Sequence, residues 1–204
     1  MNDFQKYDLL EFARRYDLEK HGLIGIAAAL LTPADAGTTW IAGGSVRNFA
    51  IKQPIDSDVD FFFRHSTDRD AFIRRVQGMT GYRKVKENEK IHTFTVEINE
   101  KKILCQAVGF AYYPDMAACL DTFDFTVTQF ATDGHTLVTG PYSLFDLARK
   151  RIAIHKISYG ASSVRRLLKY AAKGFTVCQG AAAELLRQCG AGEAIIDVDT
   201  VYVD

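Results

Sequence analysis

The residues of this chain best suited to chemistry are Asp58 and Asp60, which are separated by one valine and followed by three phenylalanines. This segment predicts a strand over residues 57–64, on which side chains two positions apart project from the same face. Paired carboxylates of this kind suit hard divalent cations such as magnesium. Two such cations about 4 Å apart activate an attacking oxygen and stabilise a leaving group. The alternative is a solvated strand edge, but the phenylalanines make this strand too apolar for one, and close carboxylates repel each other unless a cation neutralises them.

A pair of glycines, Gly43 and Gly44, precedes the aspartates and is followed by Ser45. The pair lies between an apolar, β-branched run at 38–42 that predicts a strand and a segment at 45–51 that predicts a short helix. Without a Cβ the backbone approaches a ligand closely, and the first N–H groups of a helix attract an anion. We therefore expect Gly43, Gly44 and Ser45 to hold a triphosphate. Because many glycine turns merely redirect the chain, this hypothesis depends on the aspartates that follow.

The composition is that of a folded protein without a dominant charge. Of 204 residues, 48% are hydrophobic and 25% are charged, which is typical of one sizeable domain with an appendage. Lys plus Arg and Asp plus Glu each number 25, so any contact with RNA must come from a local basic patch. The first residues lack the pattern of a signal peptide and no apolar run reaches membrane-spanning length, so we expect a cytoplasmic protein without a membrane partner. The four cysteines are widely spaced, and we expect reduced thiols that lie mostly in the core.

Hydrophobic periodicity predicts strands and helices mixed without a regular strand–helix–strand repeat, which indicates an α+β fold. We expect a helix over 3–20 and another after Gly22, a helix over 68–80, a hairpin over 90–109, a short helix over 114–121, and strands over 123–131 and 136–138. From Ser143 onward the pattern is helical, most strongly at 163–174 and 181–189. We therefore divide the chain into a head domain, residues 1–142, and a small helical extension, residues 143–204.

The glycine turn and the aspartates together resemble a known signature. Gly43-Gly44-Ser45-Val46-Arg47 followed by Asp58-Val59-Asp60 is similar to the GG-x-V-R-D and D-x-D motifs of the polymerase-β-like nucleotidyltransferases, specifically the head domain of bacterial-type CCA-adding enzymes and poly(A) polymerases. Later segments resemble that head and the start of its neck in the same order: 123–128 resembles R-R-D-F-T-I-N, 133–152 the stretch after it, and 166–175 R-A-A-R-F-A. The likeness covers residues 40–175.

The resemblance implies a nucleotidyltransferase fold, in which a mixed sheet with flanking helices precedes the helical extension. It implies Mg²⁺ or Mn²⁺ at Asp58 and Asp60, with the triphosphate of an NTP on the glycine turn and Ser45. It also implies that Arg47 lies near the phosphates or the acceptor strand. Further contacts to the nucleotide are implied for three residues of the later segments: Asp124, Arg166 and Lys169.

The reaction implied by the resemblance is transfer of a nucleoside monophosphate from the NTP to a hydroxyl group, with release of pyrophosphate. The acceptor implied is an RNA 3′ end such as that of a tRNA. Catalysis of this type needs positioning and charge neutralisation more than a dedicated protein base.

Several positions depart from the family pattern. Asn48 stands where an aspartate is usual, and Thr122-Phe123 stand where the family has two arginines. The acidic E-D-x-x-R element that selects the incoming base is missing before the neck, so the resemblance does not extend to ordered addition of C and A. On the strand where many relatives place a third carboxylate, this chain has Gln106. Glu97, across the hairpin, is either a substitute or an exposed strand residue.

These departures leave alternatives open. The acceptor is RNA, or it is a protein or small molecule, or the chain is a degenerate member that binds nucleotide or RNA, or serves as an interaction module, without turnover. Arg166, Lys169 and Lys173 fall at helical i, i+3 and i+7 spacing, and this basic ridge either contacts phosphates or is a solvated helix face. His92 has no partner motif, and we expect it at the surface.

Overall fold

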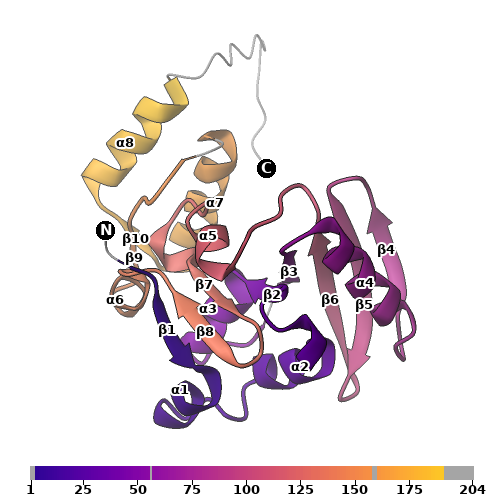
Figure 1. The fold of residues 1–204 in the computed structure, drawn as a ribbon. Helices are drawn as coiled ribbons and strands as arrows, with labels where there is room; N and C mark the ends of the chain where they lie inside the picture. Colours follow the sequence, from indigo (N-terminus) through magenta and orange to yellow (C-terminus); the bar gives the residue numbers. More distant parts are fainter. Residues whose placement is uncertain (1–2, 56, 158–159, 191–204) are drawn as a thin grey trace.

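The computed structural model describes residues 3–55, 57–157 and 160–190. A mixed eight-stranded sheet with the strand order β1-β8-β7-β2-β3-β6-β5-β4 runs through it (Figure 1). Neighbouring strands are antiparallel except β3 and β6, which are parallel. The strands are β1 Gln5–Asp8, β2 Thr39–Ala42, β3 Val59–Phe63, β4 Arg83–Glu87, β5 Ile91–Ile98, β6 Lys101–Val108, β7 Phe130–Thr132 and β8 Thr136–Thr139. The expected α+β fold with a mixed sheet is confirmed.

Helices precede, connect and follow these strands. They are α1 Leu9–Arg15, α2 Gly22–Leu30, α3 Gly44–Ala50, α4 Ser66–Gln77, α5 Met116–Leu120, α6 Ser143–Ala148, α7 Gly160–Ala172 and α8 Gln179–Gly190, with 3₁₀ turns η1 Pro33–Asp35 and η2 Thr126–Thr128. A second, two-stranded sheet pairs β9 Arg151–Ile152 with β10 Thr176–Val177 in parallel. The expectation that the segment from Ser143 onward is wholly helical is therefore wrong. Among the described residues, no helix is both long and apolar enough to cross a membrane.

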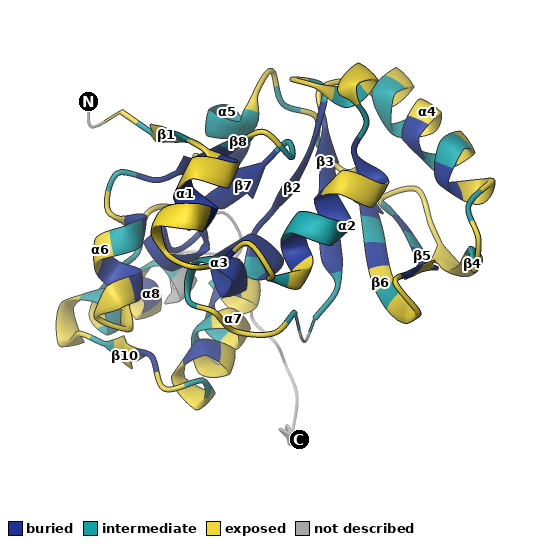
Figure 2. Cartoon of the chain, turned by 90° about the horizontal axis from the view of Figure 1, so that it is seen from below, coloured by how far each residue is buried: buried dark blue, intermediate teal, exposed yellow. Residues whose placement is uncertain are grey.

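The two faces of the sheet are covered unequally. Val59, Phe61 and Phe63 of β3 point into the larger core, to which α1, α2, α3 and α4 all contribute side chains. Phe62 points the other way, into a smaller core that includes Trp40 and residues of α5. In Figure 2 the central strands β2 and β3 are dark blue, while the helices show exposed residues on their outer sides. The alternation along β3 therefore places Asp60 on the less covered face.

The N-terminal segment differs from the single helix expected over residues 3–20. Residues Gln5–Asp8 form an edge strand that pairs with β8, and α1 begins only at Leu9. The Asp8 side chain caps this helix by accepting a hydrogen bond from the Glu11 backbone N–H at 2.7 Å. An aspartate in this position favours helix initiation, which is why the strand ends there.

The strand expected over residues 123–131 is also largely absent. The chain forms the 3₁₀ turn η2 before β7, and two threonine hydroxyls stabilise that turn. The Thr126 hydroxyl donates to Asp146 Oδ2, and the Thr128 hydroxyl donates to the Phe125 carbonyl, both at 2.7 Å. Threonine side chains that bond to nearby groups compete with strand pairing.

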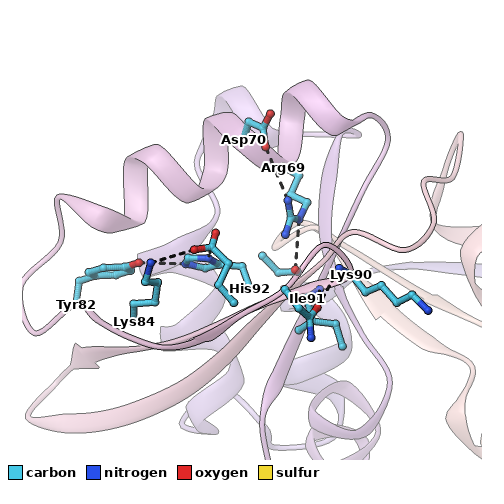
Figure 3. Close-up of polar contacts among 10 residues, drawn as sticks. Arg69, Asp70, Tyr82, Lys84, Lys90, Ile91 and His92 are labelled. Atoms are coloured by element: carbon cyan, nitrogen blue, oxygen red, sulfur yellow. Dashed lines mark hydrogen bonds and ion pairs between the residues drawn. The ribbon is translucent and has the colours of Figure 1, made fainter.

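Strand β4 at the sheet edge was not expected, because its sequence Arg-Lys-Val-Lys-Glu is mostly charged and has no apolar alternation. Every residue of the strand is exposed. His92 of β5 ties this strand to its neighbour. Its Nε2 lies 3.0 Å from the Tyr82 hydroxyl and its Nδ1 lies 3.0 Å from Glu87 Oε1 (Figure 3). The expectation of a surface histidine is wrong: the ring is fully buried against Phe94, and its hydrogen bonds satisfy both nitrogens.

Replacing His92 by alanine should lower the free energy of unfolding by about 2 kcal/mol, because it leaves a cavity and removes the hydrogen bonds to Tyr82 and Glu87. Urea denaturation followed by circular dichroism measures this change. His135→Ala is the matched control, because that side chain is exposed and its loss should change stability by less than about 0.5 kcal/mol. Equal losses in the two variants would contradict the anchoring role of His92.

The described cysteine side chains are free thiols, as expected. Cys105 and Cys119 are buried, and burial raises the pKa of each to about 12. Cys178 is exposed.

Candidate active site

The fold brings the glycine turn and the aspartates together. Ala42, the last residue of β2, is the register partner of Asp60 in the antiparallel pair β2–β3. The chain then turns sharply at Gly43, whose φ of 89° is strained for any residue with a Cβ. The Gly43 N–H donates to the Phe130 carbonyl at 2.8 Å, and α3 begins at the next residue. The turn that starts α3 therefore lies beside the strand position of Asp60.

Asp60 is the second residue of β3 and Asp58 directly precedes the strand, both beside Gln106 of β6. Gln106 is the register partner of Asp60, and its Nε2 donates a hydrogen bond to Asp58 Oδ2. Burial raises the pKa of Asp60 to about 7, and repulsion from the charge of Asp58 adds to the rise. The positive charges of Lys169 and Arg166 act in the opposite direction. The site is therefore short of positive charge, which is the environment that a bound cation would relieve.

Asp60 and the glycine turn line a cleft of about 450 Å³. Five of the residues predicted to bind metal or nucleotide line it, namely Gly43, Gly44, Asp60, Asp124 and Arg166, whereas Asp58 and Lys169 do not. The cleft therefore collects residues from β2, β3, the segment before η2 and helix α7.

Helix α7 contributes the positive charge of the cleft. Arg166 forms an ion pair with the buried carboxylate of Asp124. The backbone around Asp124 is held in place because its carbonyl accepts hydrogen bonds from the N–H groups of His155 at 2.8 Å and Lys156 at 3.3 Å. Lys169 is exposed one turn further along α7, and its charge reaches Asp60. The helix thus presents two cations toward the carboxylate end of the cleft.

Ser45 and Arg47 are not among the residues that line the cleft. Both are buried, and the Ser45 hydroxyl has no hydrogen-bond partner among the described residues. The Arg47 guanidinium lies 5.0 Å from the ring centre of Tyr170 and 6.0 Å from that of Phe175. Because Tyr170 itself lines the cleft, Arg47 packs directly behind the cleft wall and links α3 to α7.

Asn48 accounts for part of this packing. Its Oδ1 accepts hydrogen bonds from the Arg47 guanidinium at 2.8 and 3.3 Å, and its Nδ2 donates to the Pro54 carbonyl at 3.0 Å. An asparagine supplies both an acceptor and a donor here, which a carboxylate would not. Asn48 therefore fixes Arg47 and the loop that leads toward Asp58.

The sequence patterns did not reveal the aromatic part of the cleft. Its lining includes Phe62, Phe110, Tyr113, Phe123 and Tyr170. The ring of Phe62 lies 5.9 Å from that of Phe123 and 6.3 Å from that of Tyr113. Aromatic faces of this kind stack on nucleobases. The Phe-Ala-Tyr-Tyr run at 110–113 was the available signal, but it has no strand or helix periodicity.

Neither candidate for a third acidic ligand is an ionised group in the cleft. Gln106 occupies the expected place beside Asp60 but is an amide. Glu97 is exposed and lies opposite Lys102 in the β5–β6 pair. It is four residues along β5 from Thr93, which is the residue opposite Gln106, so it lies away from Asp60. Within the described ranges, no three His, Cys, Asp or Glu side chains come together as a potential metal site. Asp58 and Asp60 therefore stay the two carboxylates predicted as metal ligands.

Solved structures share this fold. The chain is similar to the Thermotoga maritima CCA-adding enzyme complexed with tRNA, with 16% identity and a TM-score of 0.60, covering 92% of this chain and 46% of that one. It is similar to a CCA-adding enzyme in complex with CTP, with 17% identity and a TM-score of 0.63, covering 93% and 46%. It is also similar to the Bacillus stearothermophilus CCA-adding enzyme in complex with CTP, with 16% identity and a TM-score of 0.52, covering 84% of this chain and 43% of that one. The nucleotidyltransferase fold is confirmed, and the chain spans slightly less than half the length of these enzymes.

Comparison with models of protein families assigns the chain to a family, although comparison with curated proteins does not. No curated protein matches the chain. The model of a family described as Gabija anti-defense 2 family protein matches residues 3–150, which is well over half of the 204 residues. The matched range includes the glycine turn, both aspartates and Asp124. The chain belongs to the Gabija anti-defense 2 family.

Proposed function

We propose that this protein transfers a nucleoside monophosphate from an NTP to a hydroxyl group, in a reaction that depends on a divalent metal and releases pyrophosphate. The observation that carries the proposal is that Asp60 lies beside the Gly43-Gly44 turn in a cleft of about 450 Å³, with a second carboxylate, Asp58, two residues before it. A cleft of this volume lies in the range of small-molecule sites.

The carboxylates suit Mg²⁺ or Mn²⁺. Asp60 lies on β3 and Asp58 directly before it, and burial together with repulsion from the charge of Asp58 raises the pKa of Asp60 to about 7. Mg²⁺ is commonly bound through one or two carboxylates together with substrate phosphates, so the protein need not supply a third. When bound, the metal would neutralise phosphate charge and activate the attacking hydroxyl.

The remaining cleft residues have distinct tasks in this proposal. The Cβ-free backbone of Gly43 and Gly44 lets the triphosphate approach, and Arg166 and Lys169 neutralise its charge. Asp124 holds the Arg166 guanidinium through their ion pair. The aromatic side chains that line the cleft stack on the base. Catalysis then comes from positioning and electrostatic stabilisation.

An RNA 3′ end is the acceptor we favour. One structure similar to this chain is an enzyme complexed with tRNA, and the basic side chains of α7 lie beside the carboxylates. The fold similarity extends over less than half of that enzyme, so the acceptor is proposed from the cleft and its charge.

A second candidate keeps the chemistry and changes the acceptor. The family description names an activity against a defence called Gabija, which favours a component of that defence as the target. Transfer of a nucleotide onto a protein of the defence would add bulk and negative charge to its surface, a change that disrupts interfaces and binding sites.

Incubation of the full chain with labelled NTPs, Mg²⁺ and either total RNA or purified Gabija proteins separates these candidates. Label on RNA supports the favoured acceptor, and label on protein supports the second candidate. Nucleotide binding without transfer to either acceptor would identify a degenerate binding module and contradict the proposed function.

A further inference from the structure

The face of the sheet that carries Asp60 continues beyond the cleft across β6, β5 and β4. Asp60, Gln106, Thr93 and Lys86 are successive register partners and form one row across four strands. Neighbouring strands lie about 4.8 Å apart, so the row is about 14 Å long. Helix α4 packs on the opposite face, where His92, Phe94 and Val96 are buried. The carboxylate site is thus one end of a longer surface.

Most side chains along this surface are at least partly accessible, although Thr95 and Val108 on the same face are buried. On β6, Leu104 is 40% exposed and Gln106 is half-buried, and on β5 Thr93 is half-buried. An exposed leucine among polar neighbours on a sheet face is an ordinary feature by itself. Its importance here is that it joins the cleft to the charged edge of the sheet.

Positive charge follows the outer edge of the surface. Arg83 and Lys86 of β4 are exposed on the same face as Asp60, and Lys90 is exposed in the turn between β4 and β5. The carboxylate of β4, β5 and β6 on this face, Glu97, lies opposite Lys102, so these two charges offset each other. Glu89, also exposed in the turn, offsets Lys90. The excess of positive charge on β4, β5 and β6 therefore comes from Arg83 and Lys86, while the chain as a whole has no net charge.

An exposed aromatic residue lies where this surface meets the cleft. Phe110 lines the cleft and is 57% exposed, and it follows Gly109, whose N–H donates to the Lys90 carbonyl at 2.7 Å. Arg69 of α4 packs so closely against Gly109 that a Cβ there would lie 2.7 Å from Arg69 Nε. This packing and the hydrogen bond to Lys90 fix the backbone that leads into Phe110, whose exposed ring lines the cleft.

We propose that this surface binds the acceptor as a single-stranded nucleic acid, with a base stacked on Phe110, the backbone along Lys90, Lys86 and Arg83, and the 3′ hydroxyl directed to Asp60. The proposal names the acceptor site for the proposed function and rests on that function for its chemistry. A row of cations beside an aromatic platform is the combination that single strands require, because phosphates need charge neutralisation and bases stack without regard to sequence. A protein partner is the competing occupant, and the measurement below decides between them.

The test measures fluorescence anisotropy of labelled single-stranded RNA and DNA of about 12 nucleotides, titrated against the full chain at several salt concentrations. The double variant Arg83→Gln/Lys86→Gln should weaken binding about tenfold or more. It should also reduce the slope of log affinity against log salt by about 1.4, since each phosphate contact contributes about 0.7. Binding of RNA alone, of DNA alone or of both, with this dependence, supports the surface and identifies the type of strand.

The matched control is Lys84→Gln/Arg74→Gln, which removes the same charge from the other side of the sheet. Lys84 pairs with Glu87, and Arg74 is exposed on α4, so this variant should bind the strand like the wild type. Equal weakening in both double variants, or none in either, would overturn the proposal in favour of a diffuse charge effect or a protein partner.

NTP binding, measured on the same proteins, separates this inference from the proposed function. The Arg83/Lys86 variant should bind NTP as the wild type does. If the wild type transfers nucleotides but the variant binds strands normally, the surface is wrong and the function stands. If the wild type binds no NTP while strand binding shows the expected dependence, the function is wrong and the surface stands.

Discussion

Replacement of Asp60 by asparagine is expected to lower the rate of nucleotidyl transfer by about 10³-fold or more. The same replacement should stabilise the metal-free protein at neutral and alkaline pH. Activity falls because an amide cannot neutralise the metal as a carboxylate does. Stability rises because the buried charge of Asp60 is unfavourable, as its raised pKa of about 7 shows. Replacement of a carboxylate that stabilises the folded protein would instead lower the free energy of unfolding.

The pH dependence follows from the direction of this shift. Between the ordinary pKa of 3.8 and about 7, the folded protein binds more protons at Asp60 than the unfolded chain does. This contribution to stability is therefore complete below pH 3.8 and is lost as the pH rises through 7. Relative to the wild type, Asp60→Asn should gain about 2–4 kcal/mol between pH 5 and pH 8, because each pKa unit corresponds to about 1.4 kcal/mol.

Urea unfolding in EDTA at these two pH values measures the gain, and added Mg²⁺ should reduce it by stabilising the wild type. Asp70→Asn is the control, because this carboxylate is exposed on α4 and its replacement should change neither activity nor the pH dependence. An unchanged difference between Asp60→Asn and the wild type from pH 5 to pH 8 would contradict the burial of an uncompensated charge.

The second large effect is expected at Arg166, since replacement by glutamine should reduce transfer by about 10²-fold. The guanidinium is positioned by Asp124 in the cleft wall, and its charge also lowers the pKa of Asp60. Its loss removes one charge on the triphosphate and shifts the pKa of Asp60 further upward, so metal binding should need a higher pH. Transfer rates measured across pH at saturating NTP report both effects.

Arg165→Gln provides the comparison for this variant. Arg165 is the exposed neighbour on the same helix and does not line the cleft, so the substitution removes the same charge without touching the site. It should retain transfer within about twofold of the wild type. A comparable loss in both variants would mean that α7 acts through its general charge and not through the Asp124–Arg166 pair.

The strand and turn that carry the proposed chemistry could be predicted because their signals are local. The apolar run after the aspartates predicts the strand that carries Asp60, although β3 begins only at Val59, and a glycine pair after an apolar run predicts a turn into a helix. The helical spacing of Arg166 and Lys169 also predicted that they share a face. The division of the chain at residue 142 stays a prediction.

Other features depend on contacts between distant segments. The pattern does not predict that Arg47 packs behind Tyr170, or that the run at 110–113 folds over Phe62, because neither segment has a period that points to its partner. Strand β4 has a fully exposed sequence and is a strand only because β5 pairs with it. In the same way, tertiary pairing with β8 converts the first residues from helix to strand.

The most direct test of nucleotidyl transfer compares ATP labelled on the α-phosphate with ATP labelled on the γ-phosphate, each incubated with the full chain, Mg²⁺ and total RNA. Transfer of a nucleoside monophosphate predicts that α-label enters the acceptor, that γ-label leaves as pyrophosphate, and that Asp60→Asn does neither. Entry of γ-label into the acceptor, or undiminished α-label incorporation by Asp60→Asn, would contradict the assignment.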